Sequence, residues 1–171
     1  IKNGTIIDPS CKREEKGDLL IADGKIARIA PCGEIQEEGC EVIDATGMVV
    51  APGLVDVPVH FRDPGFTYKE DIDTGVQAAL HGGFTSVVLM ANTKPVVDNE
   101  ETLKYVLEKG QNTPIHVYTC ASVTKRLGGS EMVDMDALHS HGAAGFTDDG
   151  IPLLDAALLE QAMKKAAQLN V

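Results

Sequence analysis

After Pro52, short apolar runs alternate four times with segments in which apolar residues have helical spacing. Such runs are typical of buried strands, and the segments between them are typical of amphipathic helices. We expect strands at 54–60, 85–91, 115–123 and 143–147. Because parallel strands are joined by crossover helices of fixed hand, the alternation predicts a parallel sheet built from βαβ units.

The expected helices begin and end at recognisable residues. The first covers 69–81, the second is capped by Asp98 or Asn99 and ends at Gly110, the third covers 132–141, and the last has Pro152 in its first turn. Four such units make half of an eight-unit barrel. The predicted fold class is therefore α/β, a partial (β/α)8 TIM-type barrel of the first four βα units. A half barrel leaves two open sheet edges, so we expect a longer polypeptide.

Residues 1–51 carry a different pattern of short apolar runs separated by turn residues. The strongest turn signal is Asp23-Gly24, which lies between two apolar runs and predicts a β-hairpin. We therefore expect a small β-sandwich segment at 1–51, followed by the first half of the barrel at 52–171.

Composition excludes several kinds of partner. The net charge is −11 and Trp is absent, which argues against nucleic acid and anionic membranes as partners. No apolar run has the length of a membrane span. The four cysteines form no CxxC pair, so reduced thiols in a cytoplasmic protein are the simplest interpretation.

Polar side chains gather at three of the predicted strand ends. They are His60, Arg62 and Asp63 after the first strand, Asn92 and Thr93 after the second, and Asp148 and Asp149 after the fourth. Each group alone also fits a turn or a helix cap. In a barrel, however, these strand ends converge on one mouth, which is where catalysis takes place. The three groups together favour a functional site.

A competing metal candidate is the His139-x-His141 pair. Residues two apart on a helix do not share a face, and this pair ends a predicted helix just before Gly142. A solvated helix terminus is the interpretation that we favour for both histidines.

Several motifs resemble one family. Those shared with the opening of cyclic amidohydrolases are Asp23-Gly24-Lys25-Ile26, Val42-Ile43-Asp44-Ala45-Thr46-Gly47 and Pro52-Gly53-Leu54-Val55-Asp56. Those similar to the bacterial type I dihydroorotases are His60-Phe61-Arg62-Asp63-Pro64-Gly65, Asn92-Thr93-Lys94-Pro95 and Phe146-Thr147-Asp148-Asp149-Gly150. The resemblance covers the whole chain as an N-terminal portion. It implies a β-sandwich beside a (β/α)8 barrel, and reversible cyclisation of N-carbamoyl-L-aspartate to dihydroorotate in pyrimidine biosynthesis.

The resemblance also implies roles for individual residues. His60 matches the second His of the family's His-x-His metal pair, and Asp149, preferred over Asp148, matches its metal-binding aspartate. Arg62 and Asn92 match the residues that hold the substrate carboxylate. These residues would serve one or two zinc ions, which bind His nitrogen and carboxylate oxygen. The general acid/base is expected beyond Val171.

One departure from the family pattern bears on activity. Pro58 stands where the first His of the metal pair is expected, and proline has no side-chain ligand atom. A catalytically inactive, dihydroorotase-like structural partner of aspartate transcarbamoylase is therefore one alternative. A related hydantoinase or allantoinase is another, disfavoured because the fourth strand lacks the lysine that these enzymes commonly carboxylate. A homodimer is a further expectation of the resemblance.

Overall fold

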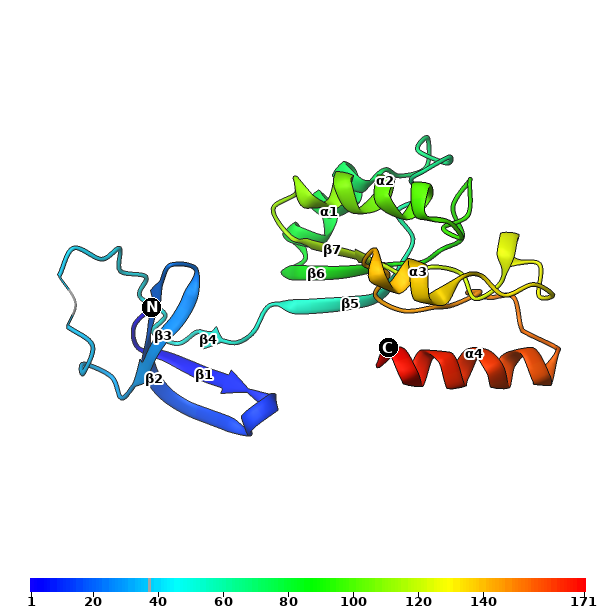
Figure 1. Ribbon diagram of the computed structural model, residues 1–171. Coiled ribbons are helices and arrows are strands. Elements are labelled where there is room, and N and C mark those ends of the chain that lie inside the picture. Colours follow the sequence, from blue (N-terminus) through cyan, green and yellow to red (C-terminus); the bar gives the residue numbers. More distant parts are fainter. Residues whose placement is uncertain (37) are drawn as a thin grey trace. The chain divides into compact units, whose positions relative to one another are not determined.

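The computed structural model describes residues 1–36 and 38–171 (Figure 1). Its contacts divide the chain into two compact units, Ile1–Pro52 and Gly53–Val171. The coarse prediction of a mixed α/β fold is confirmed, because strands occur in both units and helices pack on the sheet of the second.

The first unit contains one four-stranded sheet in the order β3-β2-β1-β4. Its elements are β1 (Gly4–Asp8), the 3₁₀ turn η1 (Pro9–Cys11), β2 (Arg13–Ala22), β3 (Lys25–Ala30) and β4 (Val49–Val50). Strand β1 runs antiparallel to β2 and parallel to β4. A second sheet packed on this one is not found among the described residues of the unit, so the β-sandwich stays a prediction.

The predicted hairpin in this unit is confirmed. Ala22 pairs with Lys25, and the two residues between them, Asp23 and Gly24, have φ values of 52° and 71°. Two successive positive φ values are what a tight type I′ connection needs, and Asp-Gly supplies them at low steric cost.

The second unit contains a parallel sheet in the order β5-β6-β7. Its strands are β5 (Leu54–Val59), β6 (Phe84–Leu89) and β7 (His116–Thr119). Its helices are α1 (Ile72–His81), α2 (Glu100–Gln111), α3 (Met135–Ser140) and α4 (Ala156–Leu169), with a 3₁₀ turn η2 (Lys125–Leu127). Figure 1 shows α1 and α2 on the same face of this sheet, where α1 contacts β6 and α2 contacts β7. None of the described helices has the length and apolar character of a membrane span.

The predicted fourth strand forms only one isolated parallel bridge, between Ala121 and Phe146. Backbone hydrogen bonds extend the pairing, because Ala144 N donates to Thr119 O and Ala121 N donates to Gly145 O. The segment around Phe146 therefore runs parallel to the continuation of β7. It delivers the residues that follow it to the same edge as the ends of β5 and β6.

Side-chain caps decide where the helices begin. Asn99 caps α2 by accepting from Thr102 N, so of the two predicted candidates Asn99 is the cap. The prediction that Pro152 lies in the first turn of the last helix is wrong. The Asp155 carboxylate accepts from the N–H groups of Ala157 and Leu158 and starts α4 at Ala156. A carboxylate at the N-cap outweighs a proline that only tolerates helical φ.

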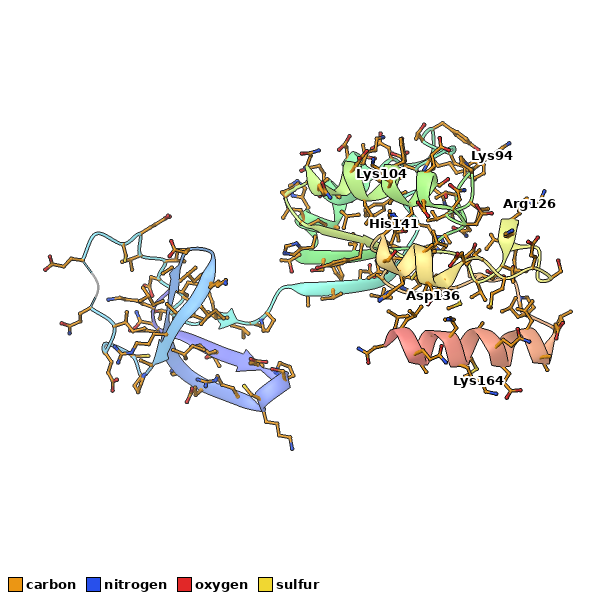
Figure 2. The ribbon with its side chains drawn as sticks, in the orientation of Figure 1. Lys94, Lys104, Arg126, Asp136, His141 and Lys164 are labelled. Atoms are coloured by element: carbon orange, nitrogen blue, oxygen red, sulfur yellow. The ribbon has the colours of Figure 1, made fainter. Side chains whose placement is uncertain are left out.

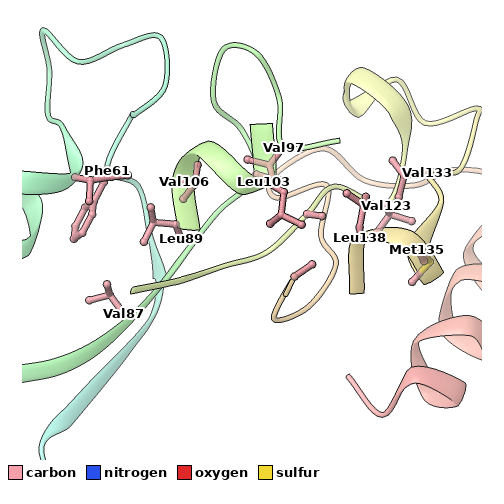
Figure 3. Packing of buried hydrophobic residues seen from close by; sticks show 14 of the residues in the cluster. Phe61, Val87, Leu89, Val97, Leu103, Val106, Val123, Val133, Met135 and Leu138 are labelled. Carbon is pink, nitrogen blue, oxygen red and sulfur yellow. The ribbon is translucent and has the colours of Figure 1, made fainter. Parts of the chain in front are cut away.

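The core of the second unit lies between the sheet and the helices (Figure 3). Val87 and Leu89 of β6 are buried with Leu103 and Val106 of α2. Phe61, directly after His60, packs against Gly75 of α1 so closely that a Cβ there would lie 2.4 Å from Phe61 Cδ1. This contact fixes the chain immediately after the end of β5.

Candidate metal and substrate site

His60, Asn92 and Asp149 reach one place from three separate segments. His60 follows β5 directly, Asn92 lies in the loop after β6, and Asp149 follows the segment paired with the continuation of β7. Because these segments are parallel, their carboxyl ends meet at one edge of the sheet. The strand pairing brings together side chains that are 32 and 57 residues apart in sequence.

Asn92 bridges the other two side chains. Its Nδ2 donates to Asp149 Oδ2 at 2.5 Å, and its Oδ1 lies 3.0 Å from His60 Nδ1. An ionised carboxylate only accepts, so the amide nitrogen must face Asp149 and the amide oxygen must face His60. His60 Nδ1 then carries the ring proton, and Nε2 of the neutral ring has its lone pair free. Nε2 lies 3.7 Å from Asp149 Oδ1.

The two neighbouring aspartates have different environments. Asp148 is 4% exposed, and its Oδ1 accepts from Val123 N at 2.7 Å and from Thr124 N at 3.0 Å. Its other oxygen accepts from the Thr124 hydroxyl. The Asp149 side chain is 26% exposed and faces His60. Asp148 therefore ties the fourth segment to the loop after β7, while Asp149 has a carboxylate accessible to a ligand.

Arg62 occupies a tight turn after the end of β5. Its φ is 56°, and its carbonyl oxygen accepts from Phe66 N at 2.8 Å. Within the part of the chain that the structure describes, its guanidinium makes no hydrogen bond or ion pair to another side chain. A guanidinium in that state retains its donors for a bound carboxylate. The hydrogen bonds that join His60, Asn92 and Asp149 do not include Arg62.

Asp63 and Thr93, which belong to the same sequence clusters, have structural contacts. Asp63 is fully buried, and its carboxylate accepts from Tyr105 OH at 2.9 Å and Lys109 Nζ at 2.7 Å. The hydrogen bond that Lys109 donates to the Asp63 carboxylate is the main cause that raises the pKa of Lys109 above its ordinary value. Thr93 Oγ1 donates to Pro95 O at 2.7 Å. The contacts of Tyr105 and Lys109 with Asp63 were not expected from the sequence, in which both residues resemble ordinary exposed positions of an amphipathic helix.

The His139-x-His141 pair lies at the end of α3, as predicted. His141 is the C-cap residue, and its Nε2 lies 3.5 Å from a Glu100 carboxylate oxygen. Among residues 1–36 and 38–171, no three or more His, Cys, Asp or Glu side chains are grouped closely enough to hold a metal ion. This applies to the His60 site too, where two such side chains meet.

The chain matches the model of one protein family, described as dihydro-orotase-like, over residues 47–171. It is 56% identical over 171 residues to a dihydroorotase of Clostridioides difficile and 52% identical over 170 residues to one of Streptococcus pneumoniae. These matches cover 100% and 99% of this chain. The chain spans about 40% of the length of each of these relatives.

Solved structures of similar fold include hydantoinases. An L-hydantoinase from Arthrobacter aurescens superposes with a TM-score of 0.80 over 98% of this chain and 38% of its own, at 22% identity. A D-hydantoinase gives a TM-score of 0.75 over 98% of this chain and 37% of its own, at 27% identity. At 22% identity, the first of these likenesses concerns the fold alone.

Proposed function

Because this chain belongs to the dihydro-orotase-like family, we propose that the protein is a dihydroorotase. The reaction is the reversible cyclisation of N-carbamoyl-L-aspartate to dihydroorotate in de novo pyrimidine biosynthesis. Dihydroorotases that are 48–56% identical over nearly the whole chain support this assignment. The observation on which the proposal rests most heavily is the meeting of His60, Asn92 and Asp149 at one sheet edge.

The same proposal includes the architecture. The parallel order β5-β6-β7, continued by the segment at Phe146, fits the first four strands of a (β/α)8 barrel. The sheet of β1 to β4 would then belong to a β-sandwich, with the boundary between the two parts at residues 51 and 52.

His60 Nε2 and Asp149 are the atoms that we assign to zinc, as one or two ions. Their chemistry fits, since zinc binds imidazole nitrogen and carboxylate oxygen at about 2.0–2.2 Å. Two donors 3.7 Å apart are close enough for both to reach one ion at such lengths. Zinc supplies Lewis acidity toward a carbonyl group and makes water nucleophilic at neutral pH. Catalytic zinc usually has three protein ligands, so further ligands are required besides these two.

Arg62 and Asn92 are the residues that we assign to the substrate carboxylate. The Arg62 guanidinium can donate two parallel hydrogen bonds to a carboxylate. The Asn92 amide carries two N–H bonds and donates one of them to Asp149, so the second is available for substrate. The general acid/base beyond Val171, a homodimer, an association with aspartate transcarbamoylase and a cytoplasmic location all stay predictions.

A related cyclic amidase is the first alternative, and the likeness to a D-hydantoinase at 27% identity favours it. Against it, the segment from Ala143 to Gly150 contains no lysine. Turnover of hydantoin without turnover of dihydroorotate would establish this alternative.

An inactive structural partner is the second alternative, and Pro58 favours it. The pairing of β5 with β6 is irregular between Asp56 and Val59, and β5 is an edge strand of the described sheet. Proline is tolerated at edges and irregularities because it has no N–H to donate to the ladder. Pro58 is thus compatible with the strand while it contributes no metal ligand.

The deciding experiment measures zinc per chain and dihydroorotate hydrolysis on the purified intact protein, with Pro58→His as comparator. Bound zinc with turnover in the unmodified protein is the expected result. Zinc or turnover that returns only in Pro58→His would identify a dihydroorotase scaffold disabled at one position. If neither variant binds zinc or turns over substrate, the structural-partner alternative replaces the proposal.

A further inference from the structure

The turn that carries Arg62 is attached to a carboxylate with no access to solvent. Asp63, the next residue, is 0% exposed, and its only charged partner in the described chain is Lys109 at 2.7 Å. A buried charge that loses its partner is strongly destabilised, and the chain then relaxes by moving or by taking up a proton. The position of Asp63 therefore depends on Lys109.

Tyr105, one helical turn before Lys109 on α2, holds the other oxygen of the same carboxylate. Its hydroxyl donates to Asp63 Oδ1 at 2.9 Å, while Lys109 donates to Oδ2. A third donor, Ile72 N at the start of α1, lies 3.4 Å from Oδ2. Two side chains of α2 and the first turn of α1 thus fix the orientation of the carboxylate.

The rest of the turn has little freedom to compensate. Pro64 O accepts from Lys94 N at 3.0 Å, and a Cβ on Gly65 would lie 2.0 Å from Lys94 O. Phe66 N closes the turn onto Arg62 O. A displacement of Asp63 therefore passes to Arg62, which is joined to it by one peptide bond.

We propose that Lys109 and Tyr105 are positioning residues that hold Arg62, through the buried Asp63 carboxylate, in the place where it grips the carboxylate of the substrate. This inference rests on the proposed function, which gives Arg62 its ligand. Neither side chain touches the substrate. Their effect on binding is carried by the backbone between Asp63 and Arg62.

A thermodynamic cycle tests this coupling. The affinity of the intact protein for orotate, a planar ring with the same carboxylate, is measured for the unmodified protein, Arg62→Ala, Lys109→Met and the double variant. Lys109→Met is expected to raise the Kd about tenfold on its own and by less than about twofold when Arg62 is already Ala. Lys109→Arg should restore most of the affinity, and Tyr105→Phe should have an intermediate effect.

The matched control is Lys104→Met. Lys104 lies on the same helix (Figure 2), but its side chain is 73% exposed and pairs with Glu108 at 3.6 Å. It should leave the Kd unchanged. If Lys109→Met weakens orotate binding equally with and without Arg62, Lys109 acts only through general stability and the inference is overturned.

A second measurement needs no ligand. Amide hydrogen exchange at Phe66, whose N–H bonds to Arg62 O, should accelerate in Lys109→Met and not in Lys104→Met. If the unmodified protein does not bind orotate, the proposed function fails, and the exchange result still decides whether Lys109 holds the turn. Unchanged exchange at Phe66 in Lys109→Met would overturn the inference regardless of function.

Discussion

Asn92 donates its side-chain N–H to Asp149 Oδ2 across 2.5 Å, although the two residues are 57 positions apart in the sequence. The same amide contacts His60 through its oxygen at 3.0 Å. One neutral side chain thus orients both of the groups that we assign to zinc. Groups that orient metal ligands in this way affect metal affinity although they do not bind the ion.

We therefore expect Asn92→Ala to lower zinc affinity about 10–100-fold, the range typical of lost orienting partners. The measurement is the zinc dissociation constant by chelator competition. Asn112→Ala is the control, since Asn112 is exposed at the end of α2 and its side-chain amide donates to Glu108 O, away from His60 and Asp149. Equal zinc affinities of the two variants would show that His60 and Asp149 need no bridge.

Replacing Asp148 should mainly lower the free energy of unfolding, whereas replacing Asp149 should mainly weaken metal binding. Asp148→Ala leaves the N–H groups of Val123 and Thr124 without their acceptor in a buried place, which should cost about 3 kcal/mol of unfolding free energy. Asp149→Ala, at a side chain that is 26% exposed, should cost less than about 1 kcal/mol and remove most of the bound zinc. Denaturant unfolding and zinc content on both variants check this. The reverse pattern would exchange the roles of the two aspartates.

The loss of folding stability at acidic pH should depend in part on Asp71. Hydrogen bonds from Thr74, first from its backbone N–H, lower the pKa of the Asp71 carboxyl, so its folded pKa lies below its unfolded pKa. Its contribution is then present above about pH 4 and is lost as the pH falls further. Asp71→Asn keeps a good N-cap without the titration. The variant should lose less stability than the unmodified protein between pH 5 and about pH 2.5, measured by thermal unfolding. Parallel pH curves for the two proteins would contradict the prediction.

The sequence predicts the order of elements well because apolar periodicity, caps and the Asp23-Gly24 turn are local signals. It fails where the deciding contact is distant. The charged residues Arg13 to Lys16 show no strand pattern, and they are extended because β1 pairs with them. The helix expected at Pro152 is a different kind of failure, because the deciding contact is local: the Asp155 carboxylate caps the N–H groups of Ala157 and Leu158, and α4 begins at Ala156.

The candidate site also contains residues that local sequence signals can indicate and residues whose roles depend on distant contacts. His60, Asn92 and the Asp148-Asp149 pair can be placed near one another from the sequence because they follow predicted parallel strands, whose ends must meet. The preference for Asp149 over Asp148 comes from the family resemblance. The roles of Asp63 and Asp148 cannot be predicted from strand order, because burial and partners such as Lys109 and Thr124 depend on tertiary packing. Asp148 is 24 positions from Thr124, and Asp63 is 46 positions from Lys109. Contacts over such separations cannot be recognised from the local sequence.

Whether Gly75→Ala stabilises or destabilises the protein depends on one contact, between residue 75 and Phe61. In an exposed helix, replacing Gly by Ala stabilises by up to about 1 kcal/mol, because Ala loses less backbone entropy. Gly75 is buried, and the added Cβ would lie 2.4 Å from Phe61 Cδ1, closer than real Cβ atoms approach ring carbons. Overpacking of this kind typically costs about 1–3 kcal/mol. We therefore expect Gly75→Ala to destabilise the protein, as measured by denaturant unfolding.

The consequence should also reach the proposed zinc site, because Phe61 follows His60 in the chain. If the ring moves to make room for the added methyl group, His60 shifts relative to Asn92 and zinc affinity falls together with stability. Gln77→Ala is the control, since Gln77 is exposed on the same helix and its replacement should change neither quantity. A Gly75→Ala variant that is more stable than the unmodified protein would mean that helix propensity outweighs the contact with Phe61. In that case the end of β5 would not be fixed by this packing.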